Sequence, residues 1–392
     1  MMTSDFKKSV ILLLAPLPPD GKPGGIGTWT ITILEELSSR ADYEVIHIDT
    51  AVKWRSTTDK KLHKRLIGGI LQGLYDAARA FRSTLKCKPD VLHLCSSGSL
   101  ATFKDILILF TQKVLGVNTV IHYHMGRIPA IKGDGGWNWK LIQFAMSLAD
   151  SVVVLDKHSE LSLTVNFSHK IKRIPNAINL KHFERISGNN LCLPTSHVNI
   201  VYIGWAIRAK GLCELISACA NISPYEFSLN IVGPIEQDFK NELEHVASKQ
   251  GNSNWLNFIG PVAYIESLQY MNDADIFVLP SYTEGFPYVI AEAMALGKPI
   301  IATKVGAIPE MLTGDDYGEC GLLIQPGKED ELRDAIVYLL EHPDEARALG
   351  LRASDRALSL YSIEHVFKQY DVLWKSLSVK FATNTNQSFD NI

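Results

Sequence analysis

Short runs of apolar residues alternate along the chain with longer stretches in which apolar residues recur every three or four positions. The short runs predict strands, and the longer stretches predict helices. Because most of the runs are apolar without interruption, we expect strands buried on both faces, as in parallel sheets. Each half of the chain has six such runs: Val10–Ala15, Glu44–Ile48, Val91–Cys95, Thr119–Tyr123, Ser151–Leu155 and Ile171–Pro175, then Asn199–Gly204, Ser228–Val232, Leu256–Ile259, Ile276–Leu279, Pro299–Ala302 and Gly321–Ile324.

This alternation of strands and helices predicts two α/β domains, each a doubly wound parallel sheet, and a length of 392 residues agrees with two cores. We expect a first domain over 1–186, a linker of turn-forming residues over 187–197 and a second domain over 198–360. The helical pattern of 361–379 is expected to pack back toward the first domain, and the polar segment 380–392 to be disordered. Two such domains would face each other across a cleft, with ligands at the carboxyl ends of their strands.

Composition narrows the class of protein. The chain has 39 Lys and Arg against 42 Asp and Glu, a net charge of −3, which argues against a nucleic-acid-binding protein because phosphate contacts need surplus positive charge. Its six cysteines are scattered without a Cys-x-x-Cys pair, a pattern typical of reduced cytosolic thiols. No apolar run is long enough for a signal peptide or a transmembrane helix, so we expect a cytoplasmic protein.

A glycine-rich loop follows the first predicted strand. Gly25 and Gly27 allow backbone amides to approach a ligand, and the N-terminus of the following helix suits a phosphate. The spacing departs from the dinucleotide pattern G-x-G-x-x-G, so a purely structural turn remains the alternative.

Two cations follow the first predicted strand of the second domain. Arg208 and Lys210 lie where that strand leads into a helix, and cations there can neutralise a diphosphate. The alternative is a pair of solvated charges. A helix N-terminus disfavours positive charge, however, so a bound anion explains the two residues better.

The loop after the predicted strand 276–279 carries the strongest pattern. Glu284 lies in this loop, and Glu292 lies two turns into the next helix among Val, Ile, Ala and Met. A carboxylate in such surroundings is costly unless it is hydrogen-bonded, and a ribose or sugar diol is a suitable donor. Gly285 permits close backbone approach, and the helix start at Phe286 and Pro287 offers free amides to phosphate. The alternative is one capping and one structural Glu.

Two histidines lie at the end of the predicted strand 119–123. His124 can bond a hydroxyl-rich ligand or handle a proton, whereas strand alternation treats His122 separately. A pair of histidines more often satisfies local structure, and no third residue with metal-ligand spacing accompanies this pair. We nevertheless interpret His124 as a binding residue, and His122 with less weight, and a structural role for the pair is the alternative.

Together these motifs resemble the large retaining glycosyltransferase family 4, which has the GT-B fold. The family signature is matched by Glu284-x7-Glu292, within Glu-Gly-Phe-Pro-x4-Glu-Ala-Met-Ala. The resemblance covers nearly the whole chain and also includes Gly-Gly-Ile-Gly at 24–27, Asp90–His93, His124-x-Gly126, Ile174–Asn176, Gly204-x5-Lys210-Gly211 and Phe258–Val262.

The resemblance implies roles in binding a nucleotide-sugar donor. Glu292 would bind the donor ribose and Glu284 the sugar hydroxyls, while Arg208 and Lys210 would hold the diphosphate. This sequence departs from the family at Trp205, where an Arg is usual, and Arg208 would take over its role.

The remaining implied contacts come from three other places. The Gly25–Gly27 loop would close on the diphosphate, the backbone around Val262 would meet the nucleobase, and His124 would contact the transferred sugar. His124, Glu284 and Lys210 would then be the catalytic residues. Anomeric configuration would be retained, by a same-face substitution in which the leaving phosphate deprotonates the acceptor hydroxyl.

We expect neither a cofactor nor a metal, because no Asp-x-Asp run is placed as a divalent-cation site. The substrates would be a UDP- or GDP-sugar and a glycan or lipid-linked acceptor. Two other classes remain: a nicotinamide oxidoreductase using the glycine loop, which leaves Glu284-x7-Glu292 unexplained, and a non-catalytic binder of nucleotide sugars, for which Trp205 gives slight support.

The stretch Val52–Lys88 is strongly basic, with ten Lys or Arg against two Asp. One interpretation is a helix packed on the sheet with a solvated basic face. The other is a helix that rests on an anionic membrane and holds the protein at the inner face of that membrane. Apolar residues recur within the stretch at helical spacing: Leu62, Leu66, Ile70, Leu74, Ala77 and Phe81.

Overall fold

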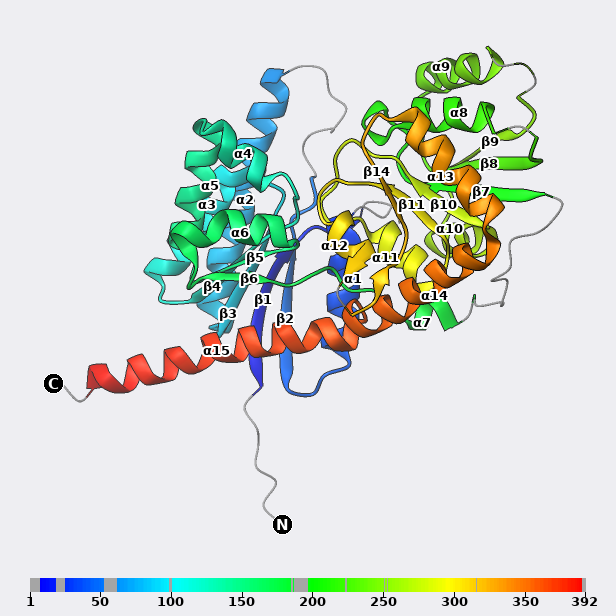
Figure 1. Ribbon diagram of the computed structural model, residues 1–392. Helices are drawn as coiled ribbons and strands as arrows, with labels where there is room; N and C mark the ends of the chain where they lie inside the picture. Colours follow the sequence, from blue (N-terminus) through cyan, green and yellow to red (C-terminus); the bar gives the residue numbers. More distant parts are fainter. Residues whose placement is uncertain are drawn as a thin grey trace. The chain divides into compact units, whose positions relative to one another are not determined.

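The computed structural model shows two compact α/β units (Figure 1). It describes residues 8–18, 25–52, 62–98, 101–184, 186, 197–222, 224–249, 251, 253–314 and 316–389, with the backbone alone at 62–67, 184 and 379–389. The first unit is Met1–Ala177 with Ile363–Ile392, and the second unit is Ile178–Ser362.

The first unit contains a six-stranded parallel sheet in the order β2-β1-β3-β4-β5-β6. Its strands are β1 (Ser9–Ala15), β2 (Tyr43–Asp49), β3 (Val91–Ser96), β4 (Asn118–Tyr123), β5 (Ser151–Val154) and β6 (Ile171–Arg173). Its helices are α1 (Gly25–Ser38), α2 (Leu62–Cys87), α3 (Thr102–Val114), α4 (Ile128–Asp134), α5 (Trp137–Leu148), α6 (Lys157–Phe167) and α15 (Ile363–Phe389).

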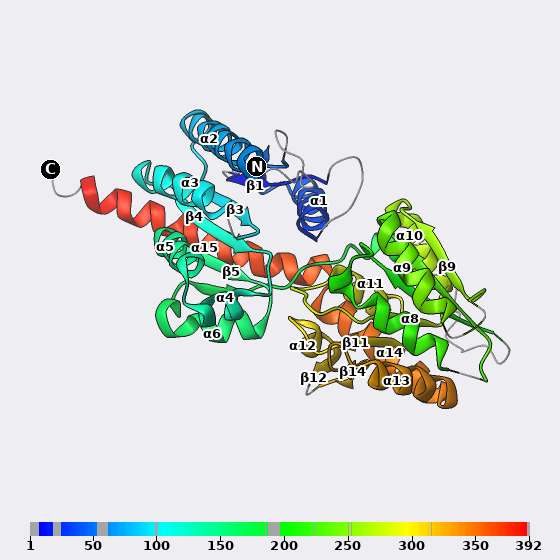
Figure 2. The same ribbon diagram turned by 90° about the horizontal axis from the view of Figure 1, so that it is seen from above.

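Helices cover both faces of this sheet, as the uninterrupted apolar runs predict (Figure 2). Leu92 and Leu94 of β3 belong to the core under α2, α3 and α5, whereas His93 between them contacts Trp374 of α15. Side chains alternate along a strand, so α15 and α1, which pack together, lie on the opposite face from α2 and α3.

The second unit repeats this architecture with a six-stranded sheet in the order β14-β11-β10-β7-β8-β9. Its strands are β7 (Val198–Ile203), β8 (Phe227–Val232), β9 (Leu256–Gly260), β10 (Ile276–Leu279), β11 (Ile300–Thr303) and β14 (Leu322–Ile324), and β12 (Thr313–Gly314) pairs with β13 (Gly318–Glu319). Its helices are α7 (Lys181–Glu184), the 3₁₀ turn Arg208–Lys210, α8 (Leu212–Ala220), α9 (Gln237–Ser248), α10 (Tyr264–Asp273), α11 (Tyr288–Ala295), α12 (Ile308–Leu312), α13 (Glu329–Glu341) and α14 (Pro343–Leu360).

The predicted parallel α/β class and all twelve predicted strands are confirmed, with strand ends shifted by no more than about two residues. The short hairpin of β12 and β13 was not predicted, because two-residue strands leave no apolar run. Burial explains the agreement: most residues of the central strands β1, β3, β7 and β10 are buried apolar side chains. Each such side chain contributes about 1.5–3 kcal/mol to folding.

The units divide at Ala177, earlier than the boundary expected at 186. The backbone amide of Ile178 donates to the carbonyl of Tyr361 at 2.8 Å, and Ile178 bridges Ser362, so the chain joins the second unit at this point. The expected linker 187–197 lies outside the described residues except for His197.

The last helix, α15, belongs to the first unit and is longer than the helix predicted over 361–379. It continues to Phe389, into the segment 380–392 for which disorder was predicted. Neither Gly nor Pro occurs between Ile363 and Phe389, so no residue in this range breaks the helix. Within the described part of the chain, no helix is both long and apolar enough to cross a membrane.

Candidate active site

The turn after β7 is held against the loop after β10. Gly211 closes the 3₁₀ turn with φ of +69°, and a Cβ there would lie 2.1 Å from the carbonyl oxygen of Pro280. Only glycine fits this left-handed, close approach. The amide of Tyr282 also donates to the carbonyl of Ala209 at 2.9 Å. The sequence-predicted cations and the Glu284 loop are thereby brought together at the carboxyl ends of neighbouring strands.

Lys210 and Glu284 form an ion pair at this junction. The Nζ atom of Lys210 lies 2.6 Å from Oε1 of Glu284, and the buried Ser281 hydroxyl donates to the same oxygen at 2.7 Å. The side chains are 24% and 11% exposed, so the pair is partly buried and still accessible to a ligand. Two predicted site residues thus meet directly.

Arg208 has a different partner. Its guanidinium forms a bidentate ion pair with Glu242 of α9, and its side chain is 72% exposed. Hydrogen bonding to Glu242 raises the pKa of Arg208 above its usual value. The structure therefore does not join Arg208 to the Lys210–Glu284 pair. Trp205, at the position where an Arg was expected, is 54% exposed.

Glu292 is buried in α11, with 4% of its surface exposed. The hydroxyl of Tyr264 donates to its Oε1 at 3.0 Å. Burial raises the pKa of Glu292 to about 7, and the Tyr264 hydrogen bond offsets part of that rise. The carboxylate therefore has an internal partner that sequence reasoning missed. One indication of this partner was present in the sequence: Tyr264 begins α10, two residues after Val262, which was expected to meet the nucleobase.

The loop between Glu284 and α11 is fixed by a second glycine. Gly306 has φ of +56°, and a Cβ there would lie 2.4 Å from the carbonyl oxygen of Glu284. The carbonyl of Gly285 accepts a hydrogen bond from the amide of Ala307 at 2.8 Å. Gly306 supports the site but was not predicted, because its role appears only when the loops after β10 and β11 meet.

The start of α11 has the form expected of an anion-binding helix end. Pro287 is the N-cap, and its side chain makes no capping hydrogen bond to the helix, so an anion can take the place of a cap there. Phe286 is buried and packs edge-on against Tyr361, with ring centroids 5.2 Å apart. Val262, predicted to meet a nucleobase, is half-buried just after β9.

In the first unit, the predicted glycines begin α1. Gly25 is the first residue of the helix, with no heavy atom within 4 Å of a Cβ built there. Gly27 is buried, and a Cβ there would lie 3.1 Å from Pro18. The loop residues 19–24 lie outside the described residues. A side chain at Gly25 would thus meet none of the described residues, whereas one at Gly27 would be tight against Pro18.

The predicted His124 follows β4 and lies in a cluster of aromatic rings. Its ring centroid is 3.8 Å from that of His122 and 5.1 Å from that of Trp29. Burial lowers the pKa of His124 to about 3, so the ring is neutral at pH 7. Both ring nitrogens of His124 are buried without a hydrogen-bond partner in the described part of the chain. Such nitrogens are suited to a bound hydroxyl.

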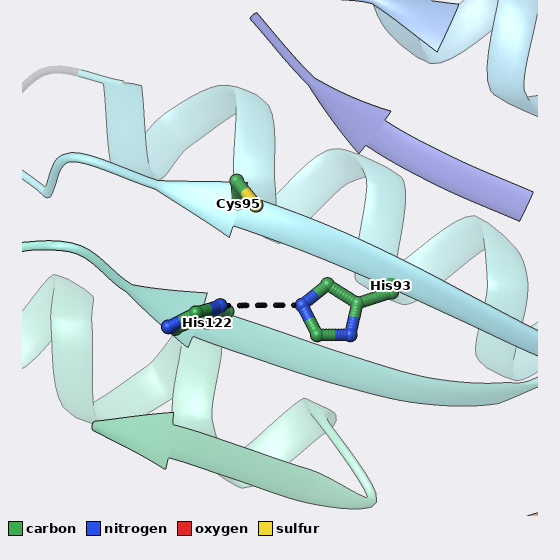
Figure 3. Close-up of side chains that lie close together, drawn as sticks. All are labelled: His93, Cys95 and His122. Atoms are coloured by element: carbon green, nitrogen blue, oxygen red, sulfur yellow. Dashed lines mark hydrogen bonds between the residues drawn. The ribbon is translucent and has the colours of Figure 1, made fainter. Parts of the chain in front are cut away.

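His122 belongs instead to a hydrogen-bonded structural chain (Figure 3). Trp374 Nε1 donates to His93 Nδ1 at 3.2 Å, so the neutral His93 ring carries its proton on Nε2 and donates to His122 Nδ1 at 3.3 Å. Burial lowers the pKa of His93 to about 3. His122 and His124 lie side by side, with ring centroids 3.8 Å apart, and both contact Trp29, so strand alternation does not separate them; they differ in that His122 Nδ1 bonds His93.

Figure 3 also shows Cys95, whose sulfur lies within 4.8 Å of ligand atoms of His93 and His122. Among the described residues, these three form a group that could hold a metal ion. The two facing histidine nitrogens already bond each other, and burial raises the pKa of the Cys95 thiol well above its usual value. The hydrogen bond between His93 and His122 accounts for the arrangement of both rings without an ion.

Comparison with known proteins shows what this chain is similar to. Residues 191–356 match the family model described as glycosyl transferases group 1. Over 177 residues, 45% of the chain, the sequence is 30% identical to MMP alpha-(1->4)-mannosyltransferase of Mycolicibacterium hassiacum. Over 278 residues, 66% of the chain, it is 27% identical to the putative teichuronic acid biosynthesis glycosyltransferase TuaC of Bacillus subtilis. The matches cover 42% and 64% of these relatives, less than two thirds of either length.

Solved structures resemble the whole fold. Sucrose-phosphate synthase from Thermosynechococcus elongatus superposes with a TM-score of 0.74 and 22% identity, covering 95% of this chain and 100% of its own. HepE from Anabaena, in complex with UDP, superposes with a TM-score of 0.70 and 19% identity, covering 94% and 100%. The chain thus has the GT-B fold, and its second unit carries a domain of the glycosyl transferases group 1 family.

Proposed function

We propose that this protein transfers a hexose-type sugar from a nucleoside diphosphate sugar to an acceptor hydroxyl, with retention of anomeric configuration and without a metal. The Lys210–Glu284 pair at the carboxyl ends of β7 and β10 carries the proposal. It places a cation and a carboxylate, 2.6 Å apart, next to the uncapped start of α11. A diphosphate needs the cation and the helix amides, and sugar hydroxyls need the carboxylate.

The mechanism we infer is charge stabilisation and orientation. Lys210 and the α11 amides neutralise the diphosphate as its bond to the anomeric carbon breaks, while Glu284 holds the sugar hydroxyls. His124, neutral and with both ring nitrogens unpartnered, contacts the transferred sugar. The leaving phosphate then removes the proton from the acceptor hydroxyl on the same face. Arg208 joins the diphosphate only if it leaves Glu242.

Glu292 is proposed to bind the donor ribose. Its surroundings favour the protonated form in the free protein, and a diol that donates two hydrogen bonds favours the carboxylate. The Gly25–Gly27 turn is proposed to meet the diphosphate, and Val262 the nucleobase. Complexes of HepE with UDP and with UDP-glucose support a nucleoside diphosphate sugar as the donor.

The acceptor is proposed to be a glycan or a lipid-linked glycan, since a relative is named for teichuronic acid biosynthesis. We further propose a cytoplasmic protein that can sit at the inner face of a membrane through 52–88. Neither a cofactor nor nucleic acid is part of this proposal.

Nucleotide titration tests the donor site. UDP and GDP, each alone and as sugar conjugates, should raise the melting temperature selectively, since a ligand at 100 times its Kd stabilises by about 2.7 kcal/mol. Glu292→Ala should weaken the preferred nucleotide roughly ten- to a hundredfold, because a hydrogen bond to a charged group contributes about 1.5–3 kcal/mol.

Glu226→Ala, an exposed glutamate of the same unit, is the matched control and should bind as the unmodified protein does. Equal affinity in the Glu292 and Glu226 variants would exclude Glu292 from the site. Tight binding without sugar transfer by the purified chain would leave a nucleotide-sugar-binding protein instead of an enzyme.

A further inference from the structure

Helix α2 exposes large apolar side chains and buries polar ones, the reverse of an ordinary amphipathic helix. Its apolar side chains Ile70, Leu74 and Phe81 are 63%, 54% and 40% exposed, so the interpretation of this stripe as packed on the sheet is wrong for them. The buried face, which packs against α3 and the sheet, carries Gln72 and Asp76, with Ala77, Ala80 and Thr84. A helix that exposes its large apolar residues needs an apolar partner.

The neighbouring helix α3 continues this surface. Phe103, Leu107, Phe110 and Val114 follow each other at spacings of four, three and four residues, and are between 36% and 72% exposed. Such spacing places them along one side of the helix. Since α2 and α3 pack against each other, the two stripes form one apolar surface, which we call the α2–α3 face.

The charges on these two helices are of one sign at the surface. Their only carboxylates, Asp76 and Asp105, are fully buried. Arg82, Lys86 and Lys113 are exposed. Apolar side chains with cations and without exposed carboxylates are typical of a surface that meets anionic lipid. Burial of the apolar area and attraction of the cations to anionic headgroups both favour the membrane.

A cavity of about 480 Å³ lies between α2 and α3, within the range of ordinary small-molecule sites. Its walls include Ile70 and Leu74 of α2 with Phe103 and Leu107 of α3, so it shares residues with the α2–α3 face. It also reaches Pro16, Thr50 and Ser96, which follow or end β1, β2 and β3. The cavity therefore connects the apolar surface to the carboxyl edge of the sheet.

The buried part of this cavity is polar. Ser96 donates to Asp105 Oδ2 at 2.6 Å, while Asp105 Oδ1, 4.0 Å from Lys104 Nζ, and Asp76 Oδ2 are buried without a hydrogen-bond partner among the described residues. An unpartnered buried oxygen is costly, and a hydroxyl group is the ligand that would satisfy it. One site thus offers apolar walls at the surface and hydroxyl-binding groups at the sheet edge.

We propose that this cavity binds the lipid-linked acceptor: the hydrocarbon chain lies between α2 and α3, and the hydroxyl-bearing headgroup reaches Ser96 and Asp105. The inference rests on the proposed sugar transfer only for calling the lipid an acceptor. The α2–α3 face then contacts the bilayer from which the lipid comes. A second protein chain is disfavoured as the occupant, since the exposed charges of both helices are all positive.

Chain-length dependence provides the test. The full chain is titrated calorimetrically with n-alkyl glucosides of increasing chain length, each kept monomeric. Every methylene that enters the cavity should strengthen binding roughly fourfold, until the cavity is full. Ala101→Phe, which adds a ring to the cavity wall, should reach that plateau at a shorter chain. Ala78→Phe, on the exposed side of α2 and outside the cavity, should follow the unmodified protein.

A second variant, at the surface, keeps the test valid if Ala101→Phe does not fold. Leu74→Glu at the mouth should abolish the gain per methylene and reduce sedimentation with phosphatidylglycerol vesicles at least tenfold. Leu161→Glu on α6, at a leucine of similar exposure (58% against 54%), should change neither. Affinity independent of chain length, or Ala101→Phe superimposing on the unmodified protein, would overturn the proposal.

These outcomes are separable from those for sugar transfer. Glucoside binding without any nucleotide binding would preserve the lipid site and remove the donor site. Nucleotide binding and transfer to water-soluble glycans without chain-length dependence would do the reverse.

Discussion

The two units share one architecture and differ in the chemistry at the carboxyl edges of their sheets. In the second unit, that edge carries the Lys210–Glu284 ion pair beside an uncapped helix start. In the first unit, the strand ends carry neutral histidines on one face of the sheet and an apolar cavity on the other. Because the strands are nearly interchangeable, the difference lies in the loops. The second unit places an accessible ion pair where a diphosphate would be held, whereas the first unit places neutral histidines on one face and apolar walls on the other, with the carboxylates Asp76 and Asp105 buried beneath those walls.

The largest effect should come from removing the charge of the second unit. Lys210→Ala should lower kcat by about 10²–10³, the usual result of deleting one group that stabilises a leaving charge. Lys210→Arg, which keeps the charge, should retain much more activity. Steady-state kinetics check this, with the exposed Lys249→Ala as the matched control. A kcat for Lys210→Ala equal to that of the control would mean that the ion pair is structural.

A fall in pH should lower the stability of the first unit but not that of the second. In the first unit, burial lowers the pKa of His93 and His124 to about 3, so their contribution to stability is full above pH 6.5 and is lost as the pH falls toward 3. In the second unit, burial raises the pKa of Glu292 from 4.5 to about 7, so its contribution is full below pH 4.5 and lost as the pH rises through 7.

Amide hydrogen exchange at pH 7 and pH 5 measures this contrast. Between pH 6.5 and 5, each buried histidine should cost the first unit on the order of 2 kcal/mol. Protection should therefore fall in β3 and β4 and hold or rise in α11. Loss of protection in both units alike would contradict the assignment of neutral, buried histidines.

The smallest expected effect concerns metal. Removal of divalent ions with EDTA should leave both sugar transfer and the melting temperature unchanged, because Lys210 and the α11 amides supply the positive charge. The His93–Cys95–His122 group is where an ion would bind if the first unit held one. A lower melting temperature after EDTA, restored by zinc, would show that the first unit binds a metal ion at this edge.

Sequence pattern predicted the sheets and the loops of the site because both depend on local order. Buried strands are apolar runs, and parallel sheets bind ligands at their carboxyl ends. Lys210 and Glu284 were predicted as separate ligands of a donor. Their direct contact depends on Gly211, whose closeness to Pro280 no local pattern reveals.

What the sequence could not predict depends on partners distant in the chain. The ion pair of Arg208 with Glu242 spans 34 residues, and Tyr264 and Glu292 are 28 residues apart. For α2, the helical period identified an apolar stripe but not the direction in which it faces. That direction is set by the small residues Ala77 and Ala80, which let the other side approach the sheet.

The contacts of α15 bear on the order in which the chain folds during synthesis. Trp29, near the beginning of the chain, donates to Tyr370 at 3.1 Å, and both rings are fully buried. The first unit therefore cannot complete its core until residues after Ile363 have left the ribosome. The second unit, Ile178–Ser362, is continuous and can fold before that point. The usual order of domain folding, in which the N-terminal domain is completed first, is thus reversed, and the α1 face of the first sheet stays uncovered until α15 has been synthesised.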